Sequence, residues 1–289
     1  MAASTNQKTG FHARSNSFPS RPNPIITQLD EHLCRSRASE GASTSSSLGG
    51  KLISLQDLQD CVNKLLLLPL TQQAIAQDKN GKWVDELLDG SLLVLDLCNT
   101  AKDALLQTKE CLHELQSILR RRGCGEAGLT SEVKKYLALR KIVNKAIRKA
   151  LKGVQNKSTF FMSNGDHETT NMFNMLKEIE VVSVKAFESL LSFISGSRAK
   201  TGWSLVSKLV HNKKVASADK ETDINEFAQV DAALLALVGQ NTNKSDNIKG
   251  VQSQLENLAL SIQDIEEGLE CLFRNLIKTR VSLLNILNH

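Results

Sequence analysis

The side chain best placed for chemistry on this chain lies close to its start, between Phe11 and Pro19. Ser17 has Arg14 three residues before it and Pro19 two residues after it. This frame is typical of a serine that a kinase phosphorylates. The phosphopeptide would resemble those bound by 14-3-3 proteins, whose Arg clusters hold the phosphate. Arg14, Ser17 and Pro19 are therefore a candidate phosphosite with its reader contacts, and they predict regulation through a protein partner.

A search for enzyme chemistry gives no catalytic residue and no cofactor. The sequence has no G-x-S-x-G elbow, no Walker-type phosphate loop, no G-x-G-x-x-G pattern and no H-E-x-x-H zinc motif. His113 stands beside Glu114, and His167 lies between Asp166 and Glu168, but both groups are typical of a solvated helix face or a helix-entry loop. We expect a protein that is not an enzyme. An active site assembled from distant helices is the alternative.

The six cysteines also predict packing rather than chemistry. They form no C-x-x-C pair and have no histidine at zinc spacing, so we expect reduced thiols and no metal site. Cys98 falls on an apolar stripe with Val94, Ala101 and Leu105, which favours a place in the core. No secretory leader follows Met1, and no run of about 18 apolar residues could span a bilayer. We expect a cytoplasmic protein, either soluble or peripheral to a membrane.

A plastid location is the alternative. Residues 2–29 carry Arg and Ser but no acid, as organelle transit peptides do. The prolines at 19, 22 and 24 argue against the amphipathic helix that such peptides usually form, because proline interrupts the backbone hydrogen bonds.

The composition defines the elements that must carry these residues. With 41% hydrophobic and only 4% aromatic residues, and few Pro and Gly, the chain favours helices. We expect an all-α fold, an elongated antiparallel bundle of long helices with a disordered N-terminal tail. Residues 1–23 form that tail, 24–50 a short helix and a Ser-rich linker, and 51–289 the helical-bundle domain. Within this domain the pattern predicts helices over 53–67, 71–77, 85–122, 130–155, 169–194 and 223–238, and a last one after a polar loop at 239–246.

The last helix carries the clearest periodic pattern. Apolar residues recur there at alternating spacings of four and three, which keeps one seam facing a neighbouring helix. They are Val251, Leu255, Leu258, Ile262, Ile265, Leu269, Leu272 and Leu276. This seam packs either inside the bundle or against a second copy, so a homodimer through the C-terminal helix is one interpretation.

The helix at 130–155 has a polar face of one sign. Five basic residues fall within about 60° of one another at about 100° per residue, and an apolar face lies opposite them. They are Lys134, Lys141, Lys145, Arg148 and Lys152. A solvated surface over a bundle core explains this pattern. Contact with an anionic membrane or an acidic partner explains it as well. Nucleic acid is a weaker candidate because Tyr136 is the helix's single aromatic residue for base stacking.

Five stretches in a fixed order carry a family resemblance. They are Phe11–Pro24, Leu67–Gln73, Lys82–Ser91, Leu115–Arg122 and Arg280–Leu287. Together they resemble the plant-specific BYPASS-like family, long described as a plant domain of unknown function. They are spread over almost the whole chain, so we expect the chain to be a member.

The resemblance implies a mostly helical plant protein. In the named member of the family it implies a role in restraining a root-derived signal that affects shoot growth, and it carries over no catalytic residue. We therefore expect a regulatory or adaptor protein, with a phosphorylated tail and a basic helix that contacts a membrane surface or a protein partner. A structural dimer without a switch is the alternative.

Overall fold

The computed structural model describes residues 23–38, 45–77, 81–121, 126–157, 167–196, 225–239 and 244–288. Arg14, Ser17 and Pro19 lie outside these ranges. The described residues form helices and no strand. In chain order these are α1 (Pro24–Ala38), α2 (Ser45–Leu66), α3 (Pro69–Gln77), α4 (Lys82–Arg120), α5 (Glu126–Lys157), α6 (His167–Ile194), α7 (Glu226–Gly239) and α8 (Lys244–Asn288).

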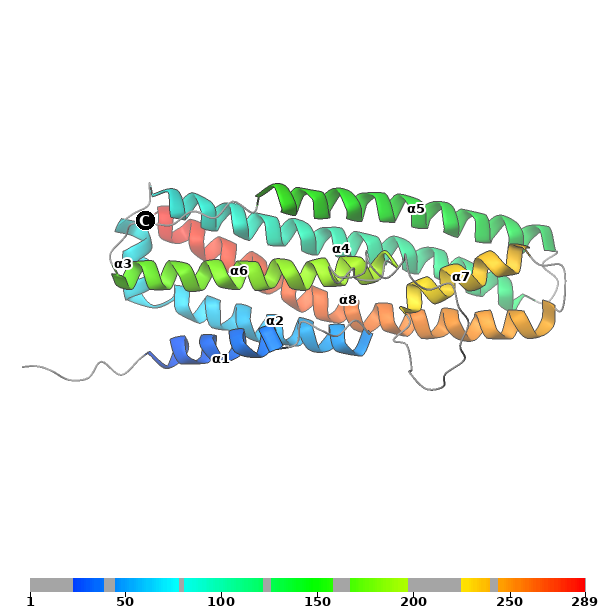
Figure 1. Cartoon of the computed structure of the whole chain (residues 1–289), viewed down its shortest axis with the longest axis horizontal. Coiled ribbons are helices and arrows are strands. Elements are labelled where there is room, and N and C mark those ends of the chain that lie inside the picture. The colour runs from blue at the N-terminus through cyan, green and yellow to red at the C-terminus, as the bar shows by residue number, and fades with distance from the viewer. Residues whose placement is uncertain are drawn as a thin grey trace, which may run out of the picture.

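The long helices lie side by side in an elongated bundle (Figure 1). α1, α4 and α6 run in one direction along the long axis, and α2, α5 and α8 run in the other. α8 has 45 residues and is therefore about 67 Å long. It packs against α2, α4 and α7. The expected fold class, an all-α elongated bundle of long antiparallel helices, is confirmed.

The apolar seam of α8 lies in the core of this bundle. Each of its eight predicted residues, from Val251 to Leu276, is at most 5% exposed. The chain's own helices α2, α4 and α7 cover this face. The structure therefore supports the interpretation of α8 as an internal bundle helix, and a homodimer through α8 would need another of its faces.

α2 begins earlier than the sequence predicts. We expected a Ser-rich linker through residue 50, but the helix starts at Ser45. Leu48, Leu52 and Leu55 recur at spacings of four and three, and all three are buried. The burial of this apolar stripe outweighs the weak helix propensity of the neighbouring Ser and Gly residues.

The short helix expected within 24–50 is present as α1, and it buries Leu29 and Leu33. It packs against α2 and α6, so the packed part of the chain begins well before residue 51. Pro69 opens α3 after a break at Leu67 and Leu68, in agreement with the predicted change of direction.

α5 also starts earlier than expected. It begins at Glu126, so Thr130 and Ser131 lie inside the helix and neither is its N-cap. α4 ends at Arg120, and Arg121 follows with an extended backbone, φ −76° and ψ 104°. Gly123, the expected left-handed cap of that helix, lies outside the described residues. α4 nevertheless buries Cys98 in the predicted apolar stripe.

The buried seam makes a prediction about stability. Leu272→Ala removes a fully buried side chain, and we expect it to lower the free energy of unfolding by about 2–5 kcal/mol because of lost burial and the remaining cavity. Leu260→Ala is the matched control on the same helix, since Leu260 is 62% exposed, and it should change stability by less than about 0.5 kcal/mol. Urea unfolding followed by circular dichroism measures both. Equal losses would show that the seam is not the core.

Candidate functional site

The basic face of α5, defined as Lys134, Lys141, Lys145, Arg148 and Lys152, points away from the bundle. All five side chains are exposed, while Tyr136, Val143, Ile147 and Val154 on the opposite face are buried. α5 packs mainly against α4, and it lies along one edge of the bundle (Figure 1). The structure thus brings the five predicted residues together on one accessible helix surface.

The charges of this face form no ion pair within the part of the chain that the structure describes. No ion pair among the described residues includes Lys134, Lys141, Lys145 or Lys152, and Arg148 contacts only the carbonyl of Asn144, at 3.1 Å. Lys135, on the flank of the same helix, behaves differently. Its ammonium lies 2.9 Å from the Glu132 carboxylate, and this hydrogen bond raises the pKa of Lys135 and lowers that of Glu132. The five residues of the basic face are therefore free to meet an outside anion.

His113 and Glu114 are one of the two local groups of titratable residues that the sequence analysis noted. Both side chains are exposed on α4. Glu114 shares a hydrogen bond with Glu132 of α5, and this bond raises the pKa of Glu114. The arrangement is a surface contact between two helices. The Cys111 thiol lies close to it, but burial, and next the negative charges of Glu114 and Glu132, raise the pKa of this thiol, so it is not an activated nucleophile. His167 and Glu168 open α6, and Asp166 lies outside the described residues.

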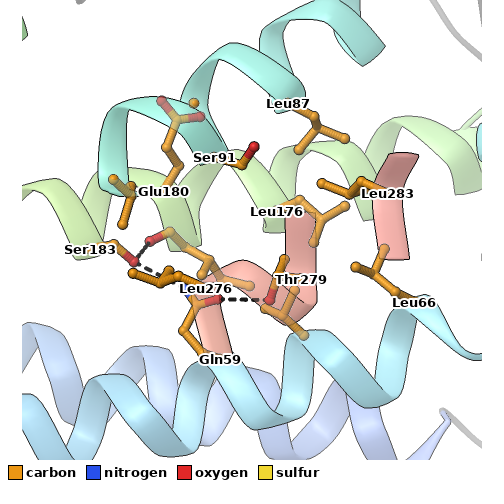
Figure 2. Close-up of a pocket in the computed structure, with 14 residues that line it drawn as sticks. Gln59, Leu66, Leu87, Ser91, Leu176, Glu180, Ser183, Leu276, Thr279 and Leu283 are labelled. Atoms are coloured by element: carbon orange, nitrogen blue, oxygen red, sulfur yellow. Dashed lines mark hydrogen bonds between the residues drawn. The ribbon is translucent and has the colours of Figure 1, made fainter. Parts of the chain in front are cut away.

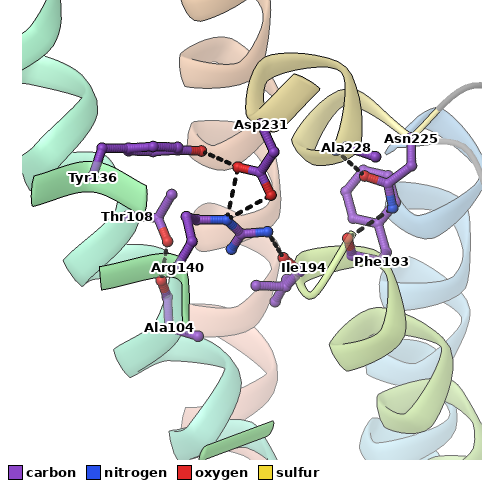
Figure 3. Close-up of polar contacts among 9 residues, drawn as sticks. All are labelled: Ala104, Thr108, Tyr136, Arg140, Phe193, Ile194, Asn225, Ala228 and Asp231. Atoms are coloured by element: carbon purple, nitrogen blue, oxygen red, sulfur yellow. Dashed lines mark hydrogen bonds and ion pairs between the residues drawn. The ribbon is translucent and has the colours of Figure 1, made fainter. Parts of the chain in front are cut away.

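A buried charge network, missed by the sequence analysis, lies on the inner side of α5 (Figure 3). Arg140 is 2% exposed. Its Nε donates to both carboxylate oxygens of Asp231 on α7, at 3.1 and 3.2 Å, and its Nη2 donates to the carbonyl of Ile194 at 2.8 Å. The guanidinium also lies over the ring of Phe227, 5.0 Å from its centroid. One arginine thus joins α5, α6 and α7.

Tyr136 completes this network. Its hydroxyl donates to Asp231 at 2.9 Å. Burial, and next the negative charge of Asp231, raise the pKa of Tyr136 well above its ordinary value. The last carbonyls of α6 need partners outside the helix. Asn225 satisfies Phe193 through its Nδ2, at 2.8 Å, and also caps α7 at Ala228. The network therefore fixes the end of α6 and the start of α7.

The sequence contained one signal for this network. Arg140 lies near the apolar side of α5, between Tyr136 and Val143, where a charge must be paired if it is buried. The partner could not be named from the sequence because Asp231 is 91 residues away.

A cavity of about 50 Å³ lies between α2, α4, α6 and α8 (Figure 2). Its walls are mostly aliphatic, and the polar side chains that line it are Gln59, Ser91, Glu180, Ser183 and Thr279. This volume holds a few water molecules and is far below the roughly 150 Å³ of a cavity that binds benzene. The hydroxyls of Ser91 and Ser183 donate to carbonyls of their own helices, both at 2.7 Å. The Thr279 hydroxyl has two acceptors in reach, the Asn63 amide oxygen at 2.9 Å and the Asn275 carbonyl at 3.0 Å. Because each hydroxyl hydrogen is donated to one of these oxygens and none to a general base, the hydroxyls that line the cavity are not activated as nucleophiles.

Two of the stretches behind the family resemblance, Lys82–Ser91 and Arg280–Leu287, meet around this cavity. Arg280 of α8 donates to the carbonyl of Leu88, at 2.7 Å, and to the hydroxyl of Ser91, at 2.8 Å. Gly90 lies under Glu180 of α6, whose carboxylate occupies the place of a Cβ. Leu66, just before the Leu67–Gln73 stretch, lines the same cavity. These stretches thus have a structural role, since they join the helices at one end of the bundle.

A family model described as Protein BPS1 matches residues 51–286. The chain belongs to the Protein BPS1 family. The predicted membership of the plant BYPASS-like family is thereby confirmed over most of the bundle. The Phe11–Pro24 stretch lies before the matched residues. No curated protein and no solved structure matches the chain.

Three further observations concern the buried thiol of Cys98, metal-binding groups and membrane-spanning helices. Burial raises the pKa of the Cys98 thiol to about 12, so this thiol is not reactive at neutral pH. In the described ranges no three His, Cys, Asp or Glu side chains form a metal-holding group. No helix there is long and apolar enough to cross a membrane.

The Arg140 network predicts that loss of a buried ion pair lowers the stability of the protein far more than loss of an exposed one. Asp231→Ala leaves a buried guanidinium without its carboxylate, and we expect a loss of about 3–5 kcal/mol in the free energy of unfolding. Arg274→Ala is the control, because the Arg274 side chain is 75% exposed in its pair with Glu270. An exposed pair of this kind contributes about 0–1 kcal/mol. Chemical denaturation measures both, and a loss below about 1 kcal/mol for Asp231→Ala would contradict this role.

Proposed function

We propose that this member of the Protein BPS1 family is a non-enzymatic regulatory adaptor that binds an anionic membrane surface through the basic face of α5. The observation that carries this proposal is the set of five exposed basic side chains on one outward helix face, none of which makes an ion pair among the described residues. The developmental role that the family resemblance implies, in root and shoot signalling, is part of the same proposal.

The strength of such a contact follows from the number of charges. Each basic residue near an anionic membrane contributes about 1 kcal/mol. Five residues on one face therefore supply up to about 5 kcal/mol, which is enough for reversible attachment and weak enough for release. Release by a change of charge suits a regulatory protein.

The position of Tyr136 supports a membrane over nucleic acid. Binding of single strands relies on aromatic side chains that stack on bases. Tyr136 is fully buried and donates its hydroxyl to Asp231, so it offers no ring to a base. A smooth anionic surface needs only the charges. An acidic protein surface would use the same charges and is an outcome of the test below.

The tail supplies the second half of the proposal. Ser17, framed by Arg14 and Pro19, is proposed as a phosphosite that recruits a 14-3-3 protein, whose Arg clusters read the phosphate. The chain would then connect a membrane surface to a protein partner, and phosphorylation would control the connection.

Vesicle co-sedimentation tests the membrane half. Lys141→Glu combined with Lys145→Glu removes two favourable charges, each worth about 1 kcal/mol. We expect binding of the full chain to vesicles containing phosphatidylserine to weaken at least about thirtyfold. Lys64→Glu combined with Lys278→Glu is the matched control. It changes the net charge equally on two exposed residues of α2 and α8, and it should keep most of the binding.

Three results would overturn this half of the proposal: no binding of the native chain, equal loss in both double variants, or unchanged binding after the α5 substitutions. Binding to neutral phosphatidylcholine vesicles alone would do so too. Recovery of an acidic protein on the native chain, without vesicle binding, would assign the face to a protein partner.

Partner recovery from plant extract tests the tail. We expect the native chain to retain a 14-3-3 protein and Ser17→Ala to lose it, because the phosphate is the main contact. Ser15→Ala is the control, since this serine stands two residues away in the same tail. Mass spectrometry of the bound fraction shows whether each chain has retained a 14-3-3 protein. Equal recovery on all three chains, or on none, would remove the tail from the mechanism.

A further inference from the structure

A groove of about 510 Å³ runs between α4 and α5, on a flank of α5 next to the basic face. Its floor is apolar and is built from small and branched side chains of both helices. They include Leu97, Ala104, Val143, Ala146 and Ala150. Ile142 stands on its rim and is 63% exposed. A helix surface that exposes such a side chain beside an apolar groove is suited to an interface.

The two walls of the groove carry opposite charges. Asp96 and Asp103 lie on the α4 side, and Lys149 lies on the α5 side. All three are exposed, and none takes part in an ion pair among the described residues. The acids continue along α4, because Asp89, Asp96, Asp103 and Glu110 follow one another at seven-residue spacing, close to two helical turns. The α4 side of the groove therefore carries a line of acids, and the α5 side carries one base, Lys149.

This layout is complementary to itself. A twofold axis parallel to the two helices places α4 of one copy against α5 of the other and keeps each residue at the same height along the axis. Residues 93–107 and 142–153 line the same groove, so they share that height. Under this symmetry Asp96 and Asp103 of one copy meet Lys149 of the other, and this happens twice in the interface. The exposed Ile142 lies on α5 and therefore faces α4 of the opposite copy.

We propose that this groove is a dimerisation face for a second copy of the chain, with α4 of each copy lying against α5 of the other. The match in charge favours this occupant. An anionic membrane on this flank would meet the acidic line of α4 and be repelled, and a purely acidic or purely basic partner would match only one wall. The predicted dimer uses neither the seam of α8 nor the five residues of the basic face.

Sedimentation equilibrium of the full chain over a range of concentrations tests the proposal. We expect a reversible monomer–dimer equilibrium that weakens at high salt, because exposed ion pairs are screened. Two charge variants should each raise the dissociation constant at least about tenfold. One is Asp96→Lys with Asp103→Lys, and the other is Ala146→Glu with Lys149→Glu.

Mixing these two variants is the decisive measurement. In each homodimer like charges face one another, on both halves of the interface. In the mixed dimer the new lysines of α4 meet the new glutamates of α5, and the native acids meet the native lysine, so both halves are complementary. We expect dimerisation to return in the mixture, which excludes misfolding as the reason for the loss.

Ile142→Glu tests the apolar contact and should also favour the monomer. Leu235→Glu is its control, since Leu235 is 58% exposed on α7 and outside the groove, and it should leave the equilibrium unchanged. A monomer at every concentration would overturn the proposal. So would a dimer that ignores both charge variants, or a mixture that stays monomeric. Vesicle binding by the variant with Asp96→Lys and Asp103→Lys, which leaves α5 unchanged, separates this proposal from the membrane proposal.

Discussion

The burial of one face of α8 along its full length constrains the rest of the molecule. A helix of about 67 Å with an apolar seam from Val251 to Leu276 must be kept away from water throughout. α2 and α4 cover most of it, and α7 and the short α3 also pack on it. Staggered helices of unequal length follow from this requirement, because no other helix of the described chain matches the 45 residues of α8. The bundle is elongated because other helices must cover the apolar seam of α8 along its whole length.

α4 has the most demanding position in this arrangement, because it packs against α8, α6 and α5. It buries small side chains such as Ala101 and Ala104 and the thiol of Cys98, which let neighbouring helices approach closely. α5 lies on the far side of α4 and has only one face to bury. Its other face is released from the packing requirement, and a dense set of lysines there costs the fold little. Freedom from packing thus makes α5 the natural place for an electrostatic contact surface.

Sequence periodicity predicted the features that depend only on side chains within the same helix. The seam of α8, the basic face of α5 and the place of Cys98 in the core all follow from side chains three and four residues apart. Features that depend on distant partners could not be predicted in this way. The pairing of Arg140 with Asp231 joins two helices across 91 residues, and Gly90 makes sense only once Glu180 lies over it. The early start of α2 belongs to the same class, since Leu48 favours the helix only when the core is present to bury it.

The polar groups inside the bundle argue that recognition takes place on its outside. The hydroxyls of Ser91, Ser183 and Thr279 bond to carbonyls of their own helices, and Arg140 is committed to Asp231 and Ile194. These groups hold neighbouring helices together, while Nη1 of Arg140 is buried without a hydrogen-bond partner among the described residues. The charges without ion pairs lie instead on the outside of the described helices, and on α4 and α5 the acids and bases lie on separate helix faces. In the function proposed above, partners recognise this pattern of charge, and the interior keeps the pattern rigid.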